Sequence, residues 1–201
     1  MKYQEILNNG LSHLGLNLES IKLEQYLELL DKWNHAYNLT AVRDLDSMVT
    51  KHILDSLAIL PFIKGKSLLD VGTGAGLPGI PLAIALPHLK IVLLDSNGKK
   101  IRFLQEVKRK LKLDNVEIIQ SRVESYHPTA LFDTLTSRAF SAIEQMLNLS
   151  RHLIVPDGIW VLMKGRRPDD ELAAIKMPSR VESYAVPGID GERCCVIIEN
   201  N

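Results

Sequence analysis

The clearest chemical signal in the sequence is a glycine-rich loop. Residues 70–76 read Asp-Val-Gly-Thr-Gly-Ala-Gly, and they follow a short apolar run and precede a segment of helical character. Glycine lets the backbone turn tightly and approach a ligand with no Cβ in the way. A glycine loop between a strand and a helix is the setting that a nucleotide-binding site requires. The loop therefore predicts a cofactor site at Gly72, Gly74 and Gly76, with a plain strand-to-helix turn as the alternative.

Two carboxylates near the loop narrow the chemistry of the ligand. Asp95 ends the next apolar run, nineteen residues after Gly76, where an acid can hydrogen-bond a ribose diol. Asp70 lies two residues before Gly72, and Leu77 occupies the position at which a dinucleotide fingerprint has its third glycine. The carboxylate of Asp70 would repel a pyrophosphate but would attract a cationic ligand. Loop and acids together favour S-adenosylmethionine, whose amino-acid end Asp70 could face, over a dinucleotide.

These residues lie in a chain that alternates between strands and helices. Apolar runs predict strands at residues 67–71, 91–95, 116–119, 131–135, 158–163 and 194–198. Periodicity and proline placement predict helices at residues 78–86, 99–113 and 143–153. Such alternation indicates an α/β fold with a mostly parallel sheet covered on both faces.

The first sixty residues have a different pattern, which is helical throughout. One amphipathic stripe consists of Leu23, Tyr26, Leu27, Leu30, Trp33 and Tyr37. Residues 38–40 are expected to end that helix, and residues 47–60 form the next one. We therefore expect a helical extension over residues 1–62, packed on a core over residues 63–201 in one compact domain.

Composition excludes several classes of protein. The 201 residues carry 24 Lys plus Arg against 24 Asp plus Glu, so the net charge is zero and the chain is not basic throughout. The two cysteines, Cys194 and Cys195, cannot form a disulfide framework or a four-ligand zinc site. The N-terminus has no apolar signal region, and no apolar run approaches the roughly 18 residues of a membrane span. We expect a soluble, cytoplasmic, monomeric protein without a metal.

Several stretches resemble the bacterial small-subunit ribosomal RNA guanine-N7 methyltransferases, the family formerly called glucose-inhibited division protein B. The longest is the loop itself, Leu69-Asp-Val-Gly-Thr-Gly-Ala-Gly-Leu-Pro-Gly-Ile-Pro81. The others are residues 38–40, 52–57, 94–96 with 99–100, 121–124, 137–140 and 164–165. The resemblance runs in order from about residue 20 to 165 and becomes thin after Gly165. It implies a class I, Rossmann-like methyltransferase fold with a seven-stranded sheet, and S-adenosylmethionine as the cofactor.

The resemblance also implies cofactor contacts at Gly72, Leu77, Val123, Glu124 and Arg138. Leu77 and Val123 are apolar and could sandwich the adenine, while Glu124 could meet the adenine amine. Arg138 would lie at the carboxyl edge of the sheet, where such sheets bind ligands. The alternatives are a surface ion pair for Arg138 and a helix N-terminal acid for Glu124.

The chemistry that the resemblance implies is methylation of a guanosine in small-subunit ribosomal RNA, naked or assembled. Guanine N7 has a free lone pair, so its methylation needs positioning rather than a general base. Positioning candidates are Arg138 and His52, although His52 and Asp55 could equally be a buried structural pair. RNA phosphates could bind Lys99, Lys100, Lys164, Arg166 and Arg167, unless these only form solvated faces. The alternative functions are a class I methyltransferase for a small molecule or protein, and a nucleotide-binding module without chemistry.

Overall fold

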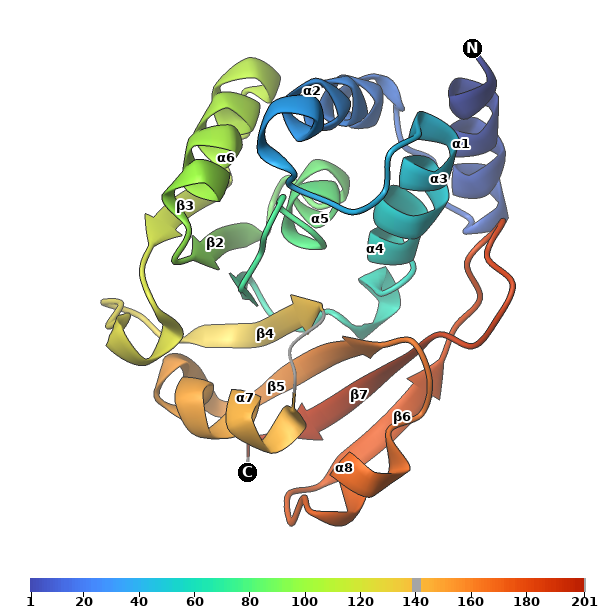
Figure 1. Ribbon diagram of the computed structural model, residues 1–201. Coiled ribbons are helices and arrows are strands. Elements are labelled where there is room, and N and C mark those ends of the chain that lie inside the picture. The colour runs from blue at the N-terminus through green and yellow to red at the C-terminus, as the bar shows by residue number, and fades with distance from the viewer. Residues whose placement is uncertain (139–141, 201) are drawn as a thin grey trace.

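The computed structural model describes residues 1–138 and 142–200. Its centre is a seven-stranded sheet with the order β3-β2-β1-β4-β5-β7-β6. The first five strands in that order are parallel, and β7 is antiparallel to both β5 and β6. The strands are β1 (Ser67–Val71), β2 (Lys90–Asp95), β3 (Val116–Gln120), β4 (Phe132–Arg138), β5 (Ile154–Lys164), β6 (Ser179–Ser183) and β7 (Cys194–Glu199). The predicted α/β fold is confirmed (Figure 1).

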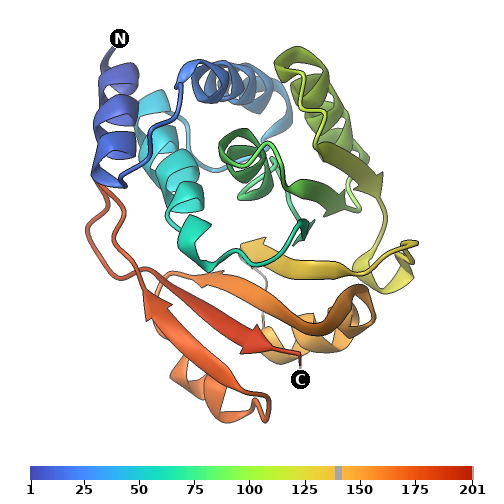
Figure 2. The same ribbon diagram turned by 180° about the vertical axis from the view of Figure 1, so that it is seen from behind.

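Helices cover the sheet unequally on its two faces. Helices α1 to α6 gather on one face and α7 lies on the other, as the front and back views both show (Figures 1 and 2). The helices are α1 (Lys2–His13), α2 (Ile21–Tyr37), α3 (Leu45–Met48), α4 (Asp55–Leu57), α5 (Gly79–Ala85), α6 (Gly98–Leu111), α7 (Ile143–Ser150) and α8 (Asp169–Ala173). Single turns of 3₁₀ helix lie at Leu60–Phe62, Val123–Ser125 and Arg151–Leu153. No helix in the described part of the chain is long and apolar enough to cross a membrane.

Alternate residues along the strands belong to two hydrophobic clusters, one on each face of the sheet. Leu68 and Leu93 belong to the larger cluster, which also contains the buried side chains of α1 and α2. Leu69 and Leu94 belong to the smaller cluster beneath α7. The N-terminal helices therefore share a core with the sheet, and the parallel strands end together at one edge.

The second predicted N-terminal helix is more irregular than its sequence suggests. Residues 47–60 were expected to form one helix, but a π-helix (Val49–Leu54) separates α3 from α4. The wider turn places His52, Ile53 and Leu54 in buried positions. Such π segments are frequent at functional sites.

The C-terminal region contains two elements that the sequence did not predict, α8 and β6. Strand β6 is half exposed and carries Arg180 and Glu182, so it has no apolar alternation to reveal it. It nevertheless pairs with β7, with Val181 opposite Val196. Strand β4 also extends beyond its expected end at Leu135 and reaches Arg138. This extension carries Arg138 to the carboxyl edge of the sheet.

Candidate cofactor and acceptor site

The glycine loop follows β1 and leads into α5, and its three glycines have different surroundings. All have positive φ: 65° at Gly72, 63° at Gly74 and 92° at Gly76. A Cβ added at Gly72 would meet nothing within 4 Å, and one at Gly74 would meet only atoms 3.9 Å away. At Gly76 it would collide with Ile80 and lie 2.9 Å from Leu104. Gly72 and Gly74 therefore border open space, whereas Gly76, predicted to contact the cofactor, packs the loop against α5 and α6.

Asp70 is fully buried beneath the loop and is only partly satisfied. Its Oδ2 accepts hydrogen bonds from the Thr73 hydroxyl at 2.6 Å and the Gly79 amide at 2.8 Å. Its Oδ1 has no hydrogen-bond partner among the described residues. Burial raises the pKa of Asp70 to about 6, against the lowering effect of the two hydrogen bonds. The site thus contains an orphaned carboxylate oxygen that a cationic ligand would stabilise.

Asp95 ends β2 and holds the loop from the other side. Its Oδ2 accepts a hydrogen bond from the Gly74 amide at 2.9 Å, and its Oδ1 accepts one from the Asn97 amide at 2.9 Å. Lys100, which we expected to bind RNA, instead places its Nζ 3.4 Å from Asp95 Oδ2. The charge of Lys100 is therefore already engaged by this carboxylate, and its binding to RNA stays a prediction.

The N-terminal extension supports the loop directly. The hydroxyl of Tyr26, on α2, donates a hydrogen bond to the Ala75 carbonyl at 2.7 Å in a fully buried contact. Burial also raises the pKa of Tyr26, so the hydroxyl stays protonated and remains a donor. Tyr26 was recognised from sequence only as one member of an apolar stripe, since a 3.6-residue period does not show which member carries a polar contact.

Leu77 and Val123, which are predicted to sandwich the adenine, are both buried in hydrophobic clusters. Leu77 packs into the larger hydrophobic cluster and Val123 into the smaller one, on opposite faces of the sheet. Contact of this pair with an adenine ring stays a prediction. Glu124 remains available at the rim, with its side chain 45% exposed and its Oε1 4.0 Å from Arg122 Nη1.

Arg138 and His52 meet at the carboxyl edge beside the loop. The two terminal nitrogens of Arg138 each lie 3.5 Å from His52 Nδ1, and Nη1 donates to the Lys51 carbonyl at 2.9 Å. His52 Nε2 lies 2.8 Å from the Thr40 hydroxyl oxygen. Burial, reinforced by the charge of Arg138, lowers the pKa of His52 to about 4. His52 is thus a neutral ring that orients Arg138, and it cannot titrate near neutral pH.

Asp55 connects this edge to the C-terminal hairpin. Its Oδ2 lies 3.7 Å from Arg138 Nη1, and its Oδ1 lies 3.5 Å from Arg193 Nε. The Tyr184 hydroxyl donates to Asp55 Oδ1 at 3.3 Å. Burial raises the pKa of Asp55, although both arginines oppose this effect. Sequence reasoning missed Arg193 and Tyr184. No local pattern indicated them, because Arg193 reaches Asp55 only through the antiparallel pairing of β7 with β5.

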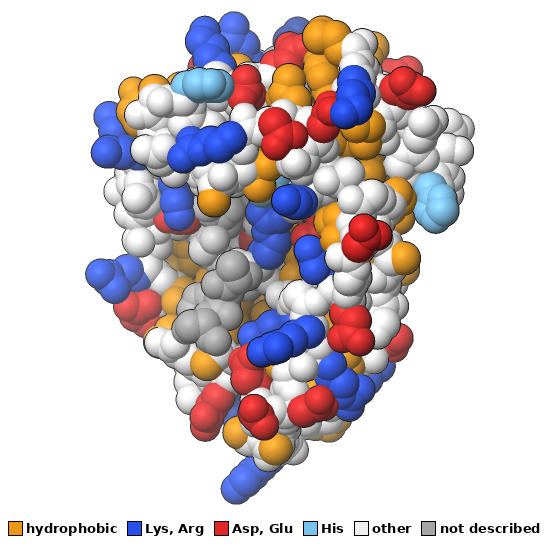
Figure 3. Space-filling view, turned by 45° about the vertical axis from the view of Figure 1, so that its right-hand side comes forward, with side chains coloured by type: hydrophobic (Ala, Val, Ile, Leu, Met, Phe, Trp, Pro, Cys, Tyr) orange, Lys and Arg blue, Asp and Glu red, His pale blue; other side chains and the backbone are white. Residues whose placement is uncertain are grey.

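The predicted basic cluster at residues 164–167 is largely neutralised. Lys164 Nζ lies 2.9 Å from Glu171 Oε1, and Arg167 Nε lies 2.7 Å from Asp169 Oδ1. Arg166 is exposed and has no side-chain partner within residues 1–138 and 142–200. Figure 3 shows Lys and Arg side chains gathered in the middle of one face, with acidic side chains close to them. Because two of their three charges are paired, residues 164–167 are a weaker candidate for phosphate binding than their sequence indicates.

No three His, Cys, Asp or Glu side chains in the described ranges are grouped so that they could hold a metal ion.

Comparison with known proteins gives consistent matches along nearly the whole chain. A family model described as "GidB: rRNA small subunit methyltransferase G" matches residues 19–192. The ribosomal RNA small subunit methyltransferase G of Legionella pneumophila (strain Philadelphia 1) is 60% identical over 199 residues, covering 99% of this chain and 96% of that protein. The protein of the same name from Pseudomonas aeruginosa (strain PAO1) is 51% identical over 199 residues, covering 96% of this chain and 93% of that protein.

Solved structures resemble the chain at the level of the fold. A SAM dependent methyltransferase from Aquifex aeolicus aligns with a TM-score of 0.59 at 18% identity, covering 77% of this chain and 93% of that one. TrmN from Thermus thermophilus aligns with a TM-score of 0.55 at 18% identity, covering 83% of this chain and 53% of that one. The expected class I methyltransferase fold is confirmed.

Proposed function

The chain belongs to the rRNA small subunit methyltransferase G family, and from that premise we propose that it transfers a methyl group from S-adenosylmethionine to N7 of a guanosine in small-subunit ribosomal RNA. The observation that carries the proposal is the conjunction of the near full-length family match with an open glycine loop above an orphaned buried carboxylate.

The residues at the loop fit this cofactor. Gly72 and Gly74 leave open the space that side chains would fill, and Asp70 offers a ligand with positive charge an oxygen that has no partner among the described residues. Asp95 is an acceptor for ribose hydroxyls, provided that it exchanges its present partners Lys100 and Gly74. When bound, S-adenosylmethionine supplies a methyl group on a cationic sulfur. We propose that Leu77, Val123 and Glu124 contact the cofactor at the rim.

The acceptor atom requires little from the protein beyond position. A guanine N7 lone pair is free at neutral pH, so the protein has to hold the base in line and exclude competing nucleophiles. His52 fits this role because its low pKa leaves it neutral, and Arg138 presents a fixed guanidinium at the same edge. We therefore assign His52 and Arg138 to positioning, with no general base.

We also propose that the protein acts as a monomer in the cytoplasm. The glycine loop, Asp70, Asp95 and Arg138 all come from one chain, so the site does not need a second copy to be complete. A ribosomal RNA substrate and two buried free cysteines agree with a reducing compartment. Sedimentation velocity of the pure protein tests the oligomeric state.

The experiment that tests the function has two steps, ligand binding and then methyl transfer. Calorimetric titration with S-adenosylhomocysteine and NAD, followed by incubation with labelled S-adenosylmethionine and unmodified small ribosomal subunits, should give binding of the first ligand and label in the RNA. Binding of NAD instead of S-adenosylhomocysteine would support the alternative of a nucleotide-binding module that catalyses no reaction. Binding of S-adenosylhomocysteine without label in RNA would support a methyltransferase for a different substrate.

A further inference from the structure

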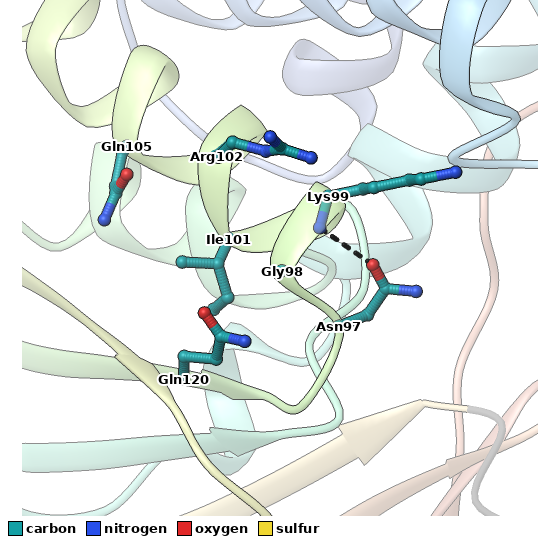
Figure 4. Close-up of a pocket in the computed structure, with 7 residues that line it drawn as sticks. All are labelled: Asn97, Gly98, Lys99, Ile101, Arg102, Gln105 and Gln120. Atoms are coloured by element: carbon teal, nitrogen blue, oxygen red, sulfur yellow. Dashed lines mark hydrogen bonds between the residues drawn. The ribbon is translucent and has the colours of Figure 1, made fainter.

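An open pocket of about 680 Å³ lies between the first half of α6 and the end of β3, and it begins at Asn97, two residues after Asp95. Its lining consists of Asn97, Gly98, Lys99, Ile101, Arg102, Gln105 and Gln120. Figure 4 shows Gln120 and Ile101 next to each other, with Lys99 and Arg102 extending from the helix. Two cations and three carboxamides line this pocket, and no acid does. A volume of this size is in the range of small-ligand sites.

Four of the five polar side chains that line the pocket have no partner among the described residues, and the fifth, Asn97, caps α6. No hydrogen bond or ion pair joins the side chains of Lys99, Arg102, Gln105 or Gln120 to the part of the chain that the structure describes. The hydrogen bond drawn in Figure 4 is donated by the Lys99 backbone amide to Asn97 Oδ1, so it does not engage the Lys99 side chain. By contrast, Asp95 engages Lys100, and Glu106 engages Arg109 farther along the same helix.

This set of groups matches the chemistry of a nucleotide. Arginine and lysine bind phosphate, and carboxamides offer paired donors and acceptors to base edges. Ile101 is 5% exposed and forms the floor of the pocket, so the exposed groups that a nucleotide would meet are the polar ones. The absence of a carboxylate from the lining removes the repulsion that a phosphate would meet beside Asp95.

The position of the pocket connects it to the reaction site. Asn97 lies two residues after Asp95 and donates its backbone amide to Asp95 Oδ1, so the pocket begins where the cofactor site ends. An RNA strand that presents one guanosine to this edge has to carry its neighbouring nucleotides past the adjoining surface. We propose that the pocket binds a second nucleotide of the substrate RNA, separate from the methylated guanosine. This inference rests on the proposed function and assigns part of RNA recognition to Arg102, Gln105 and Gln120.

The test separates RNA affinity from cofactor affinity. Arg102→Gln and the double variant Gln105→Ala/Gln120→Ala are compared with Arg109→Gln, which makes the same charge change farther along α6. Fluorescence anisotropy with transcribed small-subunit ribosomal RNA is measured over a range of salt, and calorimetry measures S-adenosylhomocysteine. We expect Arg102→Gln to weaken RNA binding on the order of tenfold and to flatten the slope of log affinity against log salt by about 0.7–0.9. The double carboxamide variant should weaken RNA binding several-fold without changing that slope, because it removes no charge.

Three outcomes would overturn or relocate the inference. If Arg102→Gln and the double carboxamide variant both had the RNA affinity and salt slope of Arg109→Gln, the pocket groups would only be solvated. A parallel loss of S-adenosylhomocysteine affinity would make the pocket part of the cofactor site. A wild-type protein that binds S-adenosylhomocysteine but neither binds nor methylates the RNA would contradict the proposed function itself, before any variant is considered. Lys99→Gln, on the same pocket wall, provides an independent repeat of the Arg102 result.

Discussion

The Asp95 carboxylate accepts a hydrogen bond from the Gly74 amide at 2.9 Å, so the acid at the end of β2 holds the loop at the end of β1. These two strands are parallel neighbours, with Val71 opposite Leu94. The acid therefore has two roles: it fixes the loop in the free protein, and it is the acceptor proposed for the ribose when it exchanges that partner.

This double role predicts the effect of Asp95→Ala. We expect S-adenosylhomocysteine to bind about 1–3 kcal/mol more weakly, since ribose hydroxyls lose a charged acceptor and the Gly74 amide loses its partner. Calorimetric titration measures the affinity, and thermal unfolding of the free protein measures the contribution to loop stability. A variant with a lower methylation rate but normal cofactor affinity would exclude the ribose role.

The glycines of the loop provide a matched pair of substitutions. Gly74→Val should leave the protein folded, at a strain cost of about 1–2 kcal/mol for its positive φ, and should abolish S-adenosylhomocysteine binding by filling open space. Gly76→Val should instead destabilise the fold by several kcal/mol, because its side chain would collide with Ile80 and Leu104. Thermal unfolding and calorimetry distinguish the two. Unchanged cofactor affinity in folded Gly74→Val would place the ligand elsewhere.

The buried Asp70 predicts a characteristic dependence on pH. Its pKa is raised to about 6, so the folded protein binds this proton more tightly than the unfolded chain does. Relative to Asp70→Asn, the free energy of unfolding of the wild type should therefore fall by roughly 1–3 kcal/mol as the pH rises from about 4 to about 7. Affinity for S-adenosylmethionine should rise over the upper part of that range in the wild type, as the carboxylate ionises, and stay flat in Asp70→Asn.

Asp133 is the control for the Asp70 experiment, with the opposite sign. Burial raises its pKa, but hydrogen bonds from Lys66 and Ser67 outweigh burial and the pKa is lowered overall. Its contribution to stability is present above its unfolded pKa and is lost as the pH falls through the folded one. If Asp70→Asn and Asp133→Asn shifted the pH profile of unfolding in the same direction, the assignment of the Asp70 titration would be incorrect.

The low pKa of His52 predicts a flat rate profile. At saturating cofactor, the single-turnover rate of methyl transfer should change little between about pH 6.5 and 8.5, because His52 stays neutral and guanine N7 needs no deprotonation. His52→Ala should lower the rate through the loss of its contact with Arg138, with the same flat profile. A rate that rises tenfold near neutrality, and does so only with His52 present, would indicate proton abstraction and a different acceptor atom.

The sequence predicts the parallel sheet and the loop well because both depend on local patterns. The strands at 67–71 and 91–95, the glycines and the acid after β2 are all close in sequence and follow backbone rules. Contacts between distant segments are not encoded in any such pattern. Asp55 and Arg193 pair across most of the chain, and nothing local to either residue indicates the other. The packing role of Gly76 likewise depends on where α6 lies.

The sequence gives the position of each basic residue along the chain but not its partner in the fold. Lys100 and Lys164 are cations of the expected type, but each has a carboxylate partner that only the fold brings near. Lys99 and Arg102, on the same helix as Lys100, have none within the described residues. Pairing in three dimensions, rather than charge density along the chain, therefore selects the cations available to RNA.

Position-resolved labelling of the RNA tests the central claim most directly. Unmodified small ribosomal subunits, and separately their naked RNA, are incubated with the wild-type protein and S-adenosylmethionine carrying a labelled methyl group. The RNA is then digested to nucleosides and to mapped fragments and analysed by mass spectrometry. The account predicts one labelled nucleotide, recovered as 7-methylguanosine, and none with Gly74→Val. Label on a different atom or base, or a labelled product with Gly74→Val at the wild-type rate, would contradict it.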